Sequence, residues 1–219
     1  MLSFVAGMVN INGVLSINTL TTNVTGHFAF FAEQFVEARY RQALTFIVFT
    51  LFFLLGAFIC NFMVELVLRA RPTISHAAPM LLEMSILVVV AFSGQGLSVS
   101  PAVIACSLLF AMGVQNALVT KISKATVRTT HLTGLFTDLG IELSQLFFYR
   151  GQAEKHKLAR SIYLRITIIA FFFSGGVIGG YLYHHFALKA LLFAAGSLVI
   201  AMLYDSIMFN ILYYLRKLS

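Results

Sequence analysis

Charged side chains are scarce in this sequence. Asp, Glu, Lys and Arg make up 11% of the residues and hydrophobic residues make up 59%, whereas charged residues are about 25% of a typical soluble domain. These proportions exclude an ordinary soluble domain. Several apolar runs reach the roughly 20 residues that a helix needs to cross a bilayer core. The sequence therefore predicts an all-α membrane protein with several spans.

Acidic residues are the scarcer of the charged groups. The chain has 8 Asp and Glu against 15 Lys and Arg, which gives a formal net charge of +7. This excess does not indicate nucleic acid as a partner. The basic residues lie in short segments between apolar runs, where membrane topology explains them better.

Cysteine and the common catalytic motifs are nearly absent. Cys60 and Cys106 lie inside apolar runs, where a free cysteine behaves as a small hydrophobic residue. The sequence has no nucleophile arrangement, no His-Glu-x-x-His, no phosphate-binding loop with lysine and no Cys-x-x-Cys. We therefore expect no enzymatic activity, no cofactor and no metal. The first residues lack a basic region and a cleavage site, so we interpret them as a retained span.

The apolar runs cover residues 1–20, 43–68, 77–95, 101–120, 161–186 and 190–215. Two shorter helical segments, about 24–37 and 132–149, each follow the polar sequence Thr-Thr-x-x-Thr-Gly. We call residues 21–26 the first break and residues 129–134 the second break. A polar interruption of this kind in an apolar chain needs a physical reason.

The resemblance between the two parts of the chain extends beyond the breaks. GMVN at 7–10 resembles GVQN at 113–116, and FFLLGAFICN at 52–61 resembles FFFSGGVIGG at 171–180, with Gly56 matched to Gly176. Three matches in one order indicate a duplication, with halves at approximately 1–98 and 99–219. The alternative is that glycine and threonine are simply common in membrane helices.

The distribution of Lys and Arg distinguishes two topologies. If both short helices cross the membrane, eight spans divide the 15 basic residues nine against six; if neither crosses, six spans divide them twelve against three. The stronger bias favours six spans and puts the basic side and both termini in the cytoplasm. Each half then has three spans, so the halves are oppositely oriented. This is a 3+3 inverted repeat, with a short re-entrant half-helix in each half, an arrangement many secondary transporters share.

A helix that begins inside the membrane directs its free N–H groups and positive dipole end into whatever cavity it meets. Irregular backbone at that depth survives only against protein or water. We expect Thr25 and Thr133, or the Thr-Thr pair before each, to cap the short helices. The glycines of the breaks would allow close approach of a neighbour or ligand. The predicted solute site is lined by Thr21, Thr22, Thr25, Gly26, Thr129, Thr130, Thr133 and Gly134, with amide contacts from Asn10, Gln115 and Asn116. The alternative is that these residues only pack helices together.

The stretch GVQNALVTKISKATVRTTHLTGLFTDLGIEL at 113–143, together with NVTGHF near the start, resembles the YoaK-like family of bacterial inner-membrane proteins of unknown function. The resemblance covers nearly the whole chain. It implies a bacterial inner-membrane location and about six spans, but no reaction. Many of the proteins it resembles carry an acid in the first span, where this chain has Asn10.

Ionisable residues within apolar spans are costly and often functional. Glu83 and Asp205 lie inside spans, while Asp138 and Glu142 are four residues apart on the second short helix. We expect these two carboxylates to raise each other's pKa and to share a proton. The four acids are the candidates for proton or ion coupling. The alternative for Asp138 is a salt bridge to Lys121, Lys124 or Arg128.

The remaining expectations concern polar residues near span ends. Glu65 is expected to pair with Arg69, and His27 and His131 are expected to be buried and hydrogen-bonded. Residues 150–160 are expected to form a cytoplasmic loop near anionic lipid headgroups, and His184-His185 to lie in an outer loop.

Taken together, these patterns predict a small transporter or channel for a polar or ionic solute. Its site would lie near the membrane midplane, between the two breaks, with proton coupling through the acids. The competing interpretation is a membrane scaffold or assembly protein without transport activity. The expected partners are the lipid bilayer and the solute. Six short spans make a small unit, so a homodimer is compatible with either function.

Overall fold

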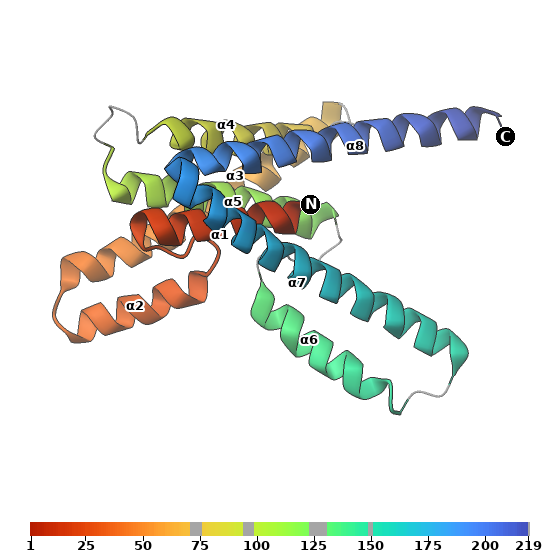
Figure 1. The fold of residues 1–219 in the computed structure, drawn as a ribbon, viewed down its shortest axis with the longest axis horizontal. Coiled ribbons are helices and arrows are strands. Elements are labelled where there is room, and N and C mark those ends of the chain that lie inside the picture. Colours follow the sequence, from red (N-terminus) through yellow and green to blue (C-terminus); the bar gives the residue numbers. More distant parts are fainter. Residues whose placement is uncertain (71–75, 94–98, 123–130, 149–150, 219) are drawn as a thin grey trace.

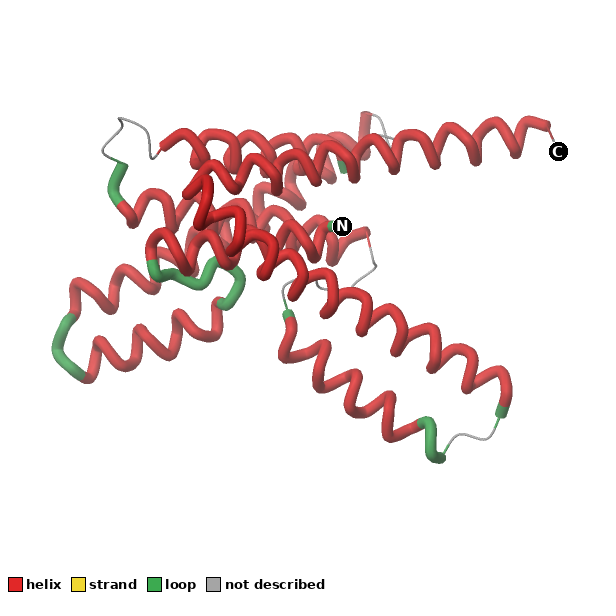
Figure 2. Tube along the Cα trace, in the orientation of Figure 1, coloured by secondary structure: helices red, strands yellow, loops and turns green. Residues whose placement is uncertain are grey.

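The computed structural model describes residues 1–70, 76–93, 99–122, 131–148 and 151–218, and of 69–70 and 205–218 the backbone alone. Within these residues the secondary structure is entirely helical, with short connections (Figure 1; Figure 2). The α-helices are α1 (Leu2–Ile17), α2 (Val24–Val36), α3 (Tyr40–Ala70), α4 (Ala77–Ser93), α5 (Pro101–Ile122), α6 (Leu132–Gln145), α7 (Gln152–Phe186) and α8 (Leu191–Leu218), with a 3₁₀ turn, η2 (Ala187–Ala190), between the last two.

Local chemistry sets where α1 ends. Asn18 adopts a left-handed conformation with φ of 51°, which asparagine tolerates better than most residues. Its N–H donates to the Val14 carbonyl at 3.0 Å, and the Thr19 N–H donates to the Gly13 carbonyl at 3.2 Å. These bonds satisfy the last carbonyls of α1 and turn the chain into the first break.

α1 and α5 contribute the most deeply buried side chains. Val5, Ala6 and Val9 of α1 and Leu108 and Met112 of α5 are all 0% exposed. They belong to one apolar cluster that also includes residues of α3, α4 and α8. The core therefore surrounds the helices that open the two predicted halves.

α1 and α7 cross in close backbone contact. A methyl group added to Gly7 would collide with the carbonyl oxygen of Phe172, and one added to Gly175 would collide with the carbonyl oxygen of Phe4. Only glycine allows two helix backbones to approach this closely.

α3 and α5 cross in the same way. A methyl group on Gly113 would meet the carbonyl oxygen of Phe53, and one on Gly56 would meet that of Phe110. Gly56 thus corresponds in its contacts to Gly175. The predicted match of Gly56 with Gly176 was one residue out of register, because the stretches 52–61 and 171–180, aligned position by position, pair Gly56 with Gly175.

The contacts also give the relative directions of the helices. Phe4 meets Gly175 and Met8 meets Gly179, so α1 and α7 run parallel. Leu2, at the start of α1, accepts a hydrogen bond from Gln115, whereas Ile17, at its end, packs against a cluster that contains Ala105 and Leu109 of α5. Figure 1 shows the two helices running in opposite directions. α1 and α5 are therefore antiparallel.

Three helical stretches are long and apolar enough to cross a membrane: Tyr40–Leu68, Pro101–Ile122 and Gln152–Tyr204, the last of which runs through α7 and η2 into α8. α1 and α4 are apolar but have only 16 and 17 residues. The predicted membrane character is confirmed at this coarser level.

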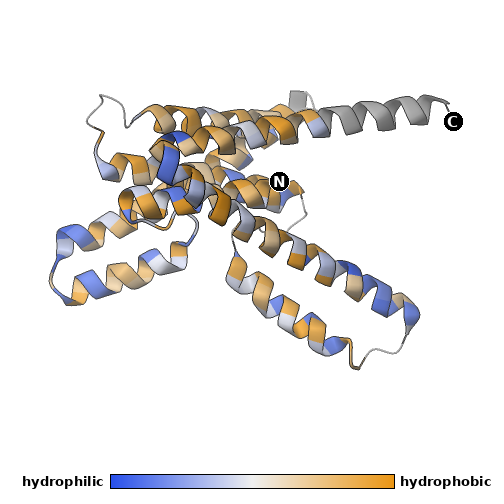
Figure 3. Cartoon of the chain, in the orientation of Figure 1, coloured by the Kyte–Doolittle hydropathy of each residue, from blue (hydrophilic) through white to orange (hydrophobic). Residues whose placement is uncertain are grey.

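Two helical hairpins, α2–α3 and α6–α7, extend from the bundle (Figure 1). Hydrophilic residues gather at the far end of each hairpin, and these ends point away from each other (Figure 3). Part of the second end is the basic segment expected as a loop. That prediction was wrong, because α7 begins at Gln152 and runs as one helix into the apolar segment.

Candidate functional site

The first break packs against α1. The Asn10 side-chain oxygen accepts hydrogen bonds from the Thr21 N–H at 3.1 Å and from the Thr22 hydroxyl at 3.0 Å. Thr21 is 0% exposed, and its methyl group lies against Gly13. The structure thus brings together three of the predicted site residues, Asn10, Thr21 and Thr22, in a packed arrangement.

The caps of the short helices differ from those predicted. Asn23 caps α2, its side-chain oxygen accepting from the Gly26 N–H at 3.0 Å. Thr25 is exposed within the first turn. The prediction that Thr25 caps α2 was wrong, because the residue that precedes the first helical position is an asparagine, which is also a preferred capping residue.

The second break shows the same geometry with a different residue. His131 is the N-cap of α6 without a side-chain capping bond, and Thr133 is exposed, so Thr133 is not the cap. The His131 ring lies over Gly134, as the Asn23 amide lies over Gly26. Both glycines therefore accommodate the capping residue of their own helix. Thr129 and Thr130 lie outside the described residues.

The predicted amide contacts from α5 do not meet the first break. Gln115 is 0% exposed, and its amide nitrogen donates to the Leu2 carbonyl at 2.6 Å. This places it at the start of α1, away from Asn10. Asn116 is half-buried, and its carbonyl accepts from the Thr120 hydroxyl at 2.7 Å.

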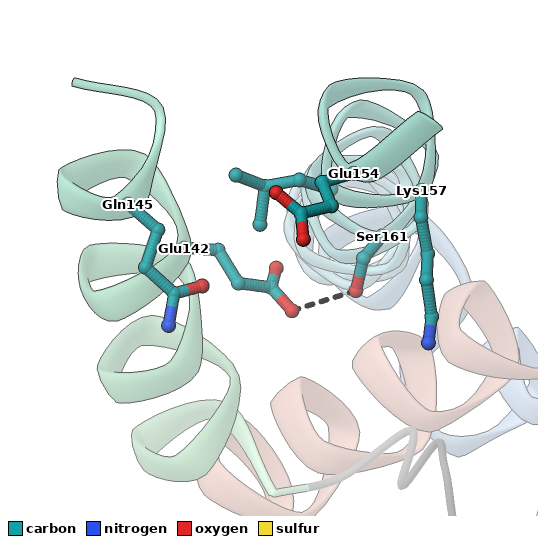
Figure 4. Close-up of a pocket in the computed structure, with 6 residues that line it drawn as sticks. Glu142, Gln145, Glu154, Lys157 and Ser161 are labelled. Atoms are coloured by element: carbon teal, nitrogen blue, oxygen red, sulfur yellow. Dashed lines mark hydrogen bonds between the residues drawn. The ribbon is translucent and has the colours of Figure 1, made fainter. Parts of the chain in front are cut away.

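Asp138 and Glu142 share an arginine. Arg165 of α7 donates to Asp138 at 2.8 Å and to Glu142 at 2.9 and 3.1 Å. Ser161 adds a bond to Glu142 at 2.6 Å (Figure 4). The prediction that the two carboxylates share a proton was wrong, because a cation lies between them. The predicted alternative was a salt bridge, but its partner is Arg165.

The charge state of Glu142 follows from this arrangement. α6 is not among the helices long and apolar enough to span. Partial burial favours a higher pKa for Glu142, but the hydrogen bonds from Arg165 and Ser161 and the arginine charge outweigh it and lower the pKa. Glu142 is therefore ionised at neutral pH, contrary to the predicted upward shift.

Glu83 lies in a different part of the molecule. It is 0% exposed on α4, and neither carboxylate oxygen has a hydrogen-bond partner among the described residues. A buried acid is expected to be paired, because burying an unsatisfied polar group is costly. The role of Glu83 in proton or ion coupling stays a prediction. Asp205 lies on α8, but its side chain lies outside the described residues.

One polar cluster escaped the sequence analysis. Lys121 donates to the Asn61 side chain at 2.7 Å and forms a salt bridge with Glu65. Cys60, 1% exposed, lies within electrostatic range of both Lys121 and Glu83. The pairing of Glu65 with Lys121 joins α3 to α5. The side chain of Arg69, the predicted partner of Glu65, lies outside the described residues.

The histidines follow the predictions in part. His27 is 1% exposed and bonded to the Leu20 carbonyl at 2.7 Å, which confirms its buried state. His131 is exposed, so that prediction was wrong. His184 and His185 are exposed but belong to the last turn of α7. Over the described part of the chain, no group of three or more His, Cys, Asp or Glu side chains is placed to hold a metal.

The comparison with protein families gives one match. The family model described as "Protein of unknown function (DUF1275)" matches residues 1–204. No curated protein and no solved structure matches the chain. Because the family model covers nearly the whole sequence, the chain belongs to the DUF1275 family of proteins of unknown function.

Proposed function

We propose that the protein is a membrane transporter or channel for a small polar or ionic solute, and that Glu83 takes up and releases a proton or attracts a cation during its cycle. The observation that carries the proposal is the complete burial of Glu83 with both carboxylate oxygens lacking a partner among the described residues. An ionisable side chain kept inside a membrane bundle at such a cost is a functional candidate.

Helix direction supports six crossings. If α2 crossed the membrane with α1, α3, α4 and α5, then α1 and α5 would run parallel. They are antiparallel, which supports a topology in which α2 does not cross. If α6 crossed, α7 would oppose α1, but the two are parallel. We therefore propose that both short helices remain on one side or enter without crossing, which makes the two halves inverted.

The helix crossings support a repeat. α1 of the first half crosses α7 of the second, and α5 of the second half crosses α3 of the first. Both crossings use two glycines against phenylalanine carbonyls. The correspondence joins residues far apart in sequence. Inverted repeats of this kind commonly place a solute site between their halves.

The proposed solute site has fewer residues than the sequence predicted. Asn10, Thr21 and Thr22 bond to one another and are engaged in packing. Thr25 and Thr133 are exposed at the starts of α2 and α6 and remain candidates for solute contact. Because Arg165 forms ion pairs with both Asp138 and Glu142, coupling is assigned to Glu83, with Asp205 as a second candidate.

The test is proton and solute flux in proteoliposomes that enclose a pH-sensitive dye. Gradients of alkali cations, halides, small organic acids and amines are applied to wild type and to Glu83→Gln. We expect the wild type to move one class of solute and Glu83→Gln to lose proton-coupled flux while staying folded. Asp138→Asn is the matched control and should retain flux, because Asp138 is exposed and Arg165 keeps its contact with Glu142.

The second candidate function is a membrane scaffold. The packed state of the first break favours it, since Thr21 is fully buried against Gly13 rather than open to a solute. A scaffold predicts no flux of any solute from folded protein. Equal flux in wild type and Glu83→Gln would instead support transport and contradict a role for Glu83 in coupling.

A further inference from the structure

A pocket lies between α6 and α7, apart from Glu83 and the breaks. Its volume is about 320 Å³, and its lining residues are Glu142, Gln145, Glu154, Lys157, Leu158 and Ser161 (Figure 4). Glu142 and Gln145 come from α6 and the other four from α7. The volume is at the lower end of the range for small-molecule sites, so the pocket suits a small polar group.

Two opposite charges in this pocket, Glu154 and Lys157, form no ion pair with any residue that the structure describes. Glu142 is already bonded to Arg165 and Ser161. Glu154 and Lys157 are both exposed, and no ion pair is found for either within the described residues. Glu154 belongs to the first turn of α7, where the helix dipole favours a carboxylate. The pocket thus offers one anion, one cation and the Gln145 amide.

The surroundings of the pocket indicate where its ligand comes from. Phe147 and Phe148, directly after α6, are 86% and 81% exposed, and Tyr163 on α7 is 74% exposed. Lys155 and Arg160 lie on α7, between Phe148 and Tyr163 in the sequence. Aromatic residues next to basic ones are typical of the membrane–water interface. A ligand at this level is most readily supplied by the bilayer itself.

We propose that this pocket binds a phospholipid headgroup that carries both a primary ammonium and a phosphate, as phosphatidylethanolamine does. The ammonium bonds to the Glu154 carboxylate and the Gln145 carbonyl, and the phosphate bonds to the Lys157 ammonium. A trimethylated headgroup has no N–H to donate, and a headgroup without nitrogen leaves Glu154 without a partner. The pocket should therefore prefer the primary amine.

The test is lipid retention measured by native mass spectrometry of the full chain in detergent, with equal amounts of phosphatidylethanolamine, phosphatidylcholine and phosphatidylglycerol. We expect wild type to retain phosphatidylethanolamine about tenfold over phosphatidylcholine, the factor typical of one charge-assisted hydrogen bond. Glu154→Gln should abolish this preference, and Lys157→Gln should lower the retention of both lipids. Lys155→Gln removes the same charge outside the pocket and should keep the preference.

Equal retention of the ethanolamine and choline lipids by the wild type would overturn the proposal. So would a preference for phosphatidylglycerol that Lys155→Gln and Lys157→Gln reduce equally, since that describes a general basic surface. Displacement of bound lipid by free phosphoethanolamine as effectively as by a short-chain lipid would overturn the lipid as the source. All three substituted side chains are exposed, so the variants should fold.

Discussion

At the scale of single residues, Asn10 fixes the first break to α1. One side-chain oxygen accepts two hydrogen bonds and holds the first break on α1. A carboxylate oxygen can accept the same two bonds, so this geometry would also accommodate an aspartate at this position.

This geometry predicts different outcomes for two substitutions of Asn10. Asn10→Asp keeps the acceptor and should retain the fold. Asn10→Leu removes both bonds and should lower the free energy of unfolding by about 1–3 kcal/mol, at roughly 0.5–1.5 kcal/mol for each bond. Denaturation in detergent, followed by circular dichroism, measures the difference. Thr25→Ala changes an exposed side chain in the same segment and is the control. An Asn10→Leu variant with the free energy of unfolding of the wild type would contradict this role of Asn10.

Arg165 shows what sequence spacing cannot supply. The i, i+4 spacing correctly placed Asp138 and Glu142 on one helix face. It gave no information on the residue opposite, because Arg165 comes from another helix and lies 23 positions beyond Glu142. The charge state of the pair depended on that residue, and the predicted proton sharing failed for this reason.

The lowered pKa of Glu142 predicts how the α6–α7 contact depends on pH. The pKa is below its reference value of 4.5 when the contact is formed. The stabilisation is therefore complete above that value and is lost as the pH falls through the lowered pKa. Spin labels on α6 and α7 should report a constant distance near pH 7 and a broadened distribution near pH 3. In Glu142→Gln the distribution should change less with pH, because only the contact of Arg165 with Asp138 remains. An identical response in both proteins would refute the assignment.

At the scale of elements, the starts of the short helices were predictable because polar sequence precedes each one, whereas α6 ends at Gln145, before the predicted 149. α2 and α6 begin at Val24 and Leu132, as expected. The start of α7 was missed, since charge in residues 152–160 was interpreted as a loop although those residues continue one helix. Composition distinguishes segments that span a membrane from segments exposed to water. It does not show whether an exposed segment is a helix or a loop.

The crossing of α1 and α7 predicts that alanine substitutions at two adjacent glycines differ in their effect on stability. Gly175→Ala places a methyl group against the Phe4 carbonyl and should cost at least the roughly 1–3 kcal/mol typical of overpacking. Gly176→Ala meets only the Gly7 carbonyl at 3.9 Å and should be nearly neutral. Thermal unfolding in one detergent compares the two. A similar loss of stability in both variants would show that a cause other than the helix crossing disfavours alanine at these positions.

At the scale of the whole molecule, the proposed inversion of the halves can be tested by labelling. Glu37, exposed between α2 and α3, and Lys155, exposed near the start of α7, should lie on opposite sides of the membrane. With eight crossings they would lie on the same side. Single cysteines at these positions, with Cys60 and Cys106 replaced by alanine, should differ in reaction with an impermeant maleimide on intact cells. Only Glu37→Cys should react before permeabilisation; equal labelling would rule out six crossings.

The glycine crossings also determine the order in which the protein can be completed. α1 leaves the ribosome early, but the helix that covers its glycine face is α7, and α3 finds its closest partner in α5. During synthesis α1 and α3 are therefore made before the helices that cover their glycine faces. We expect a chain that stops before α7 to leave the glycine face of α1 uncovered, because its close partner has not yet been made.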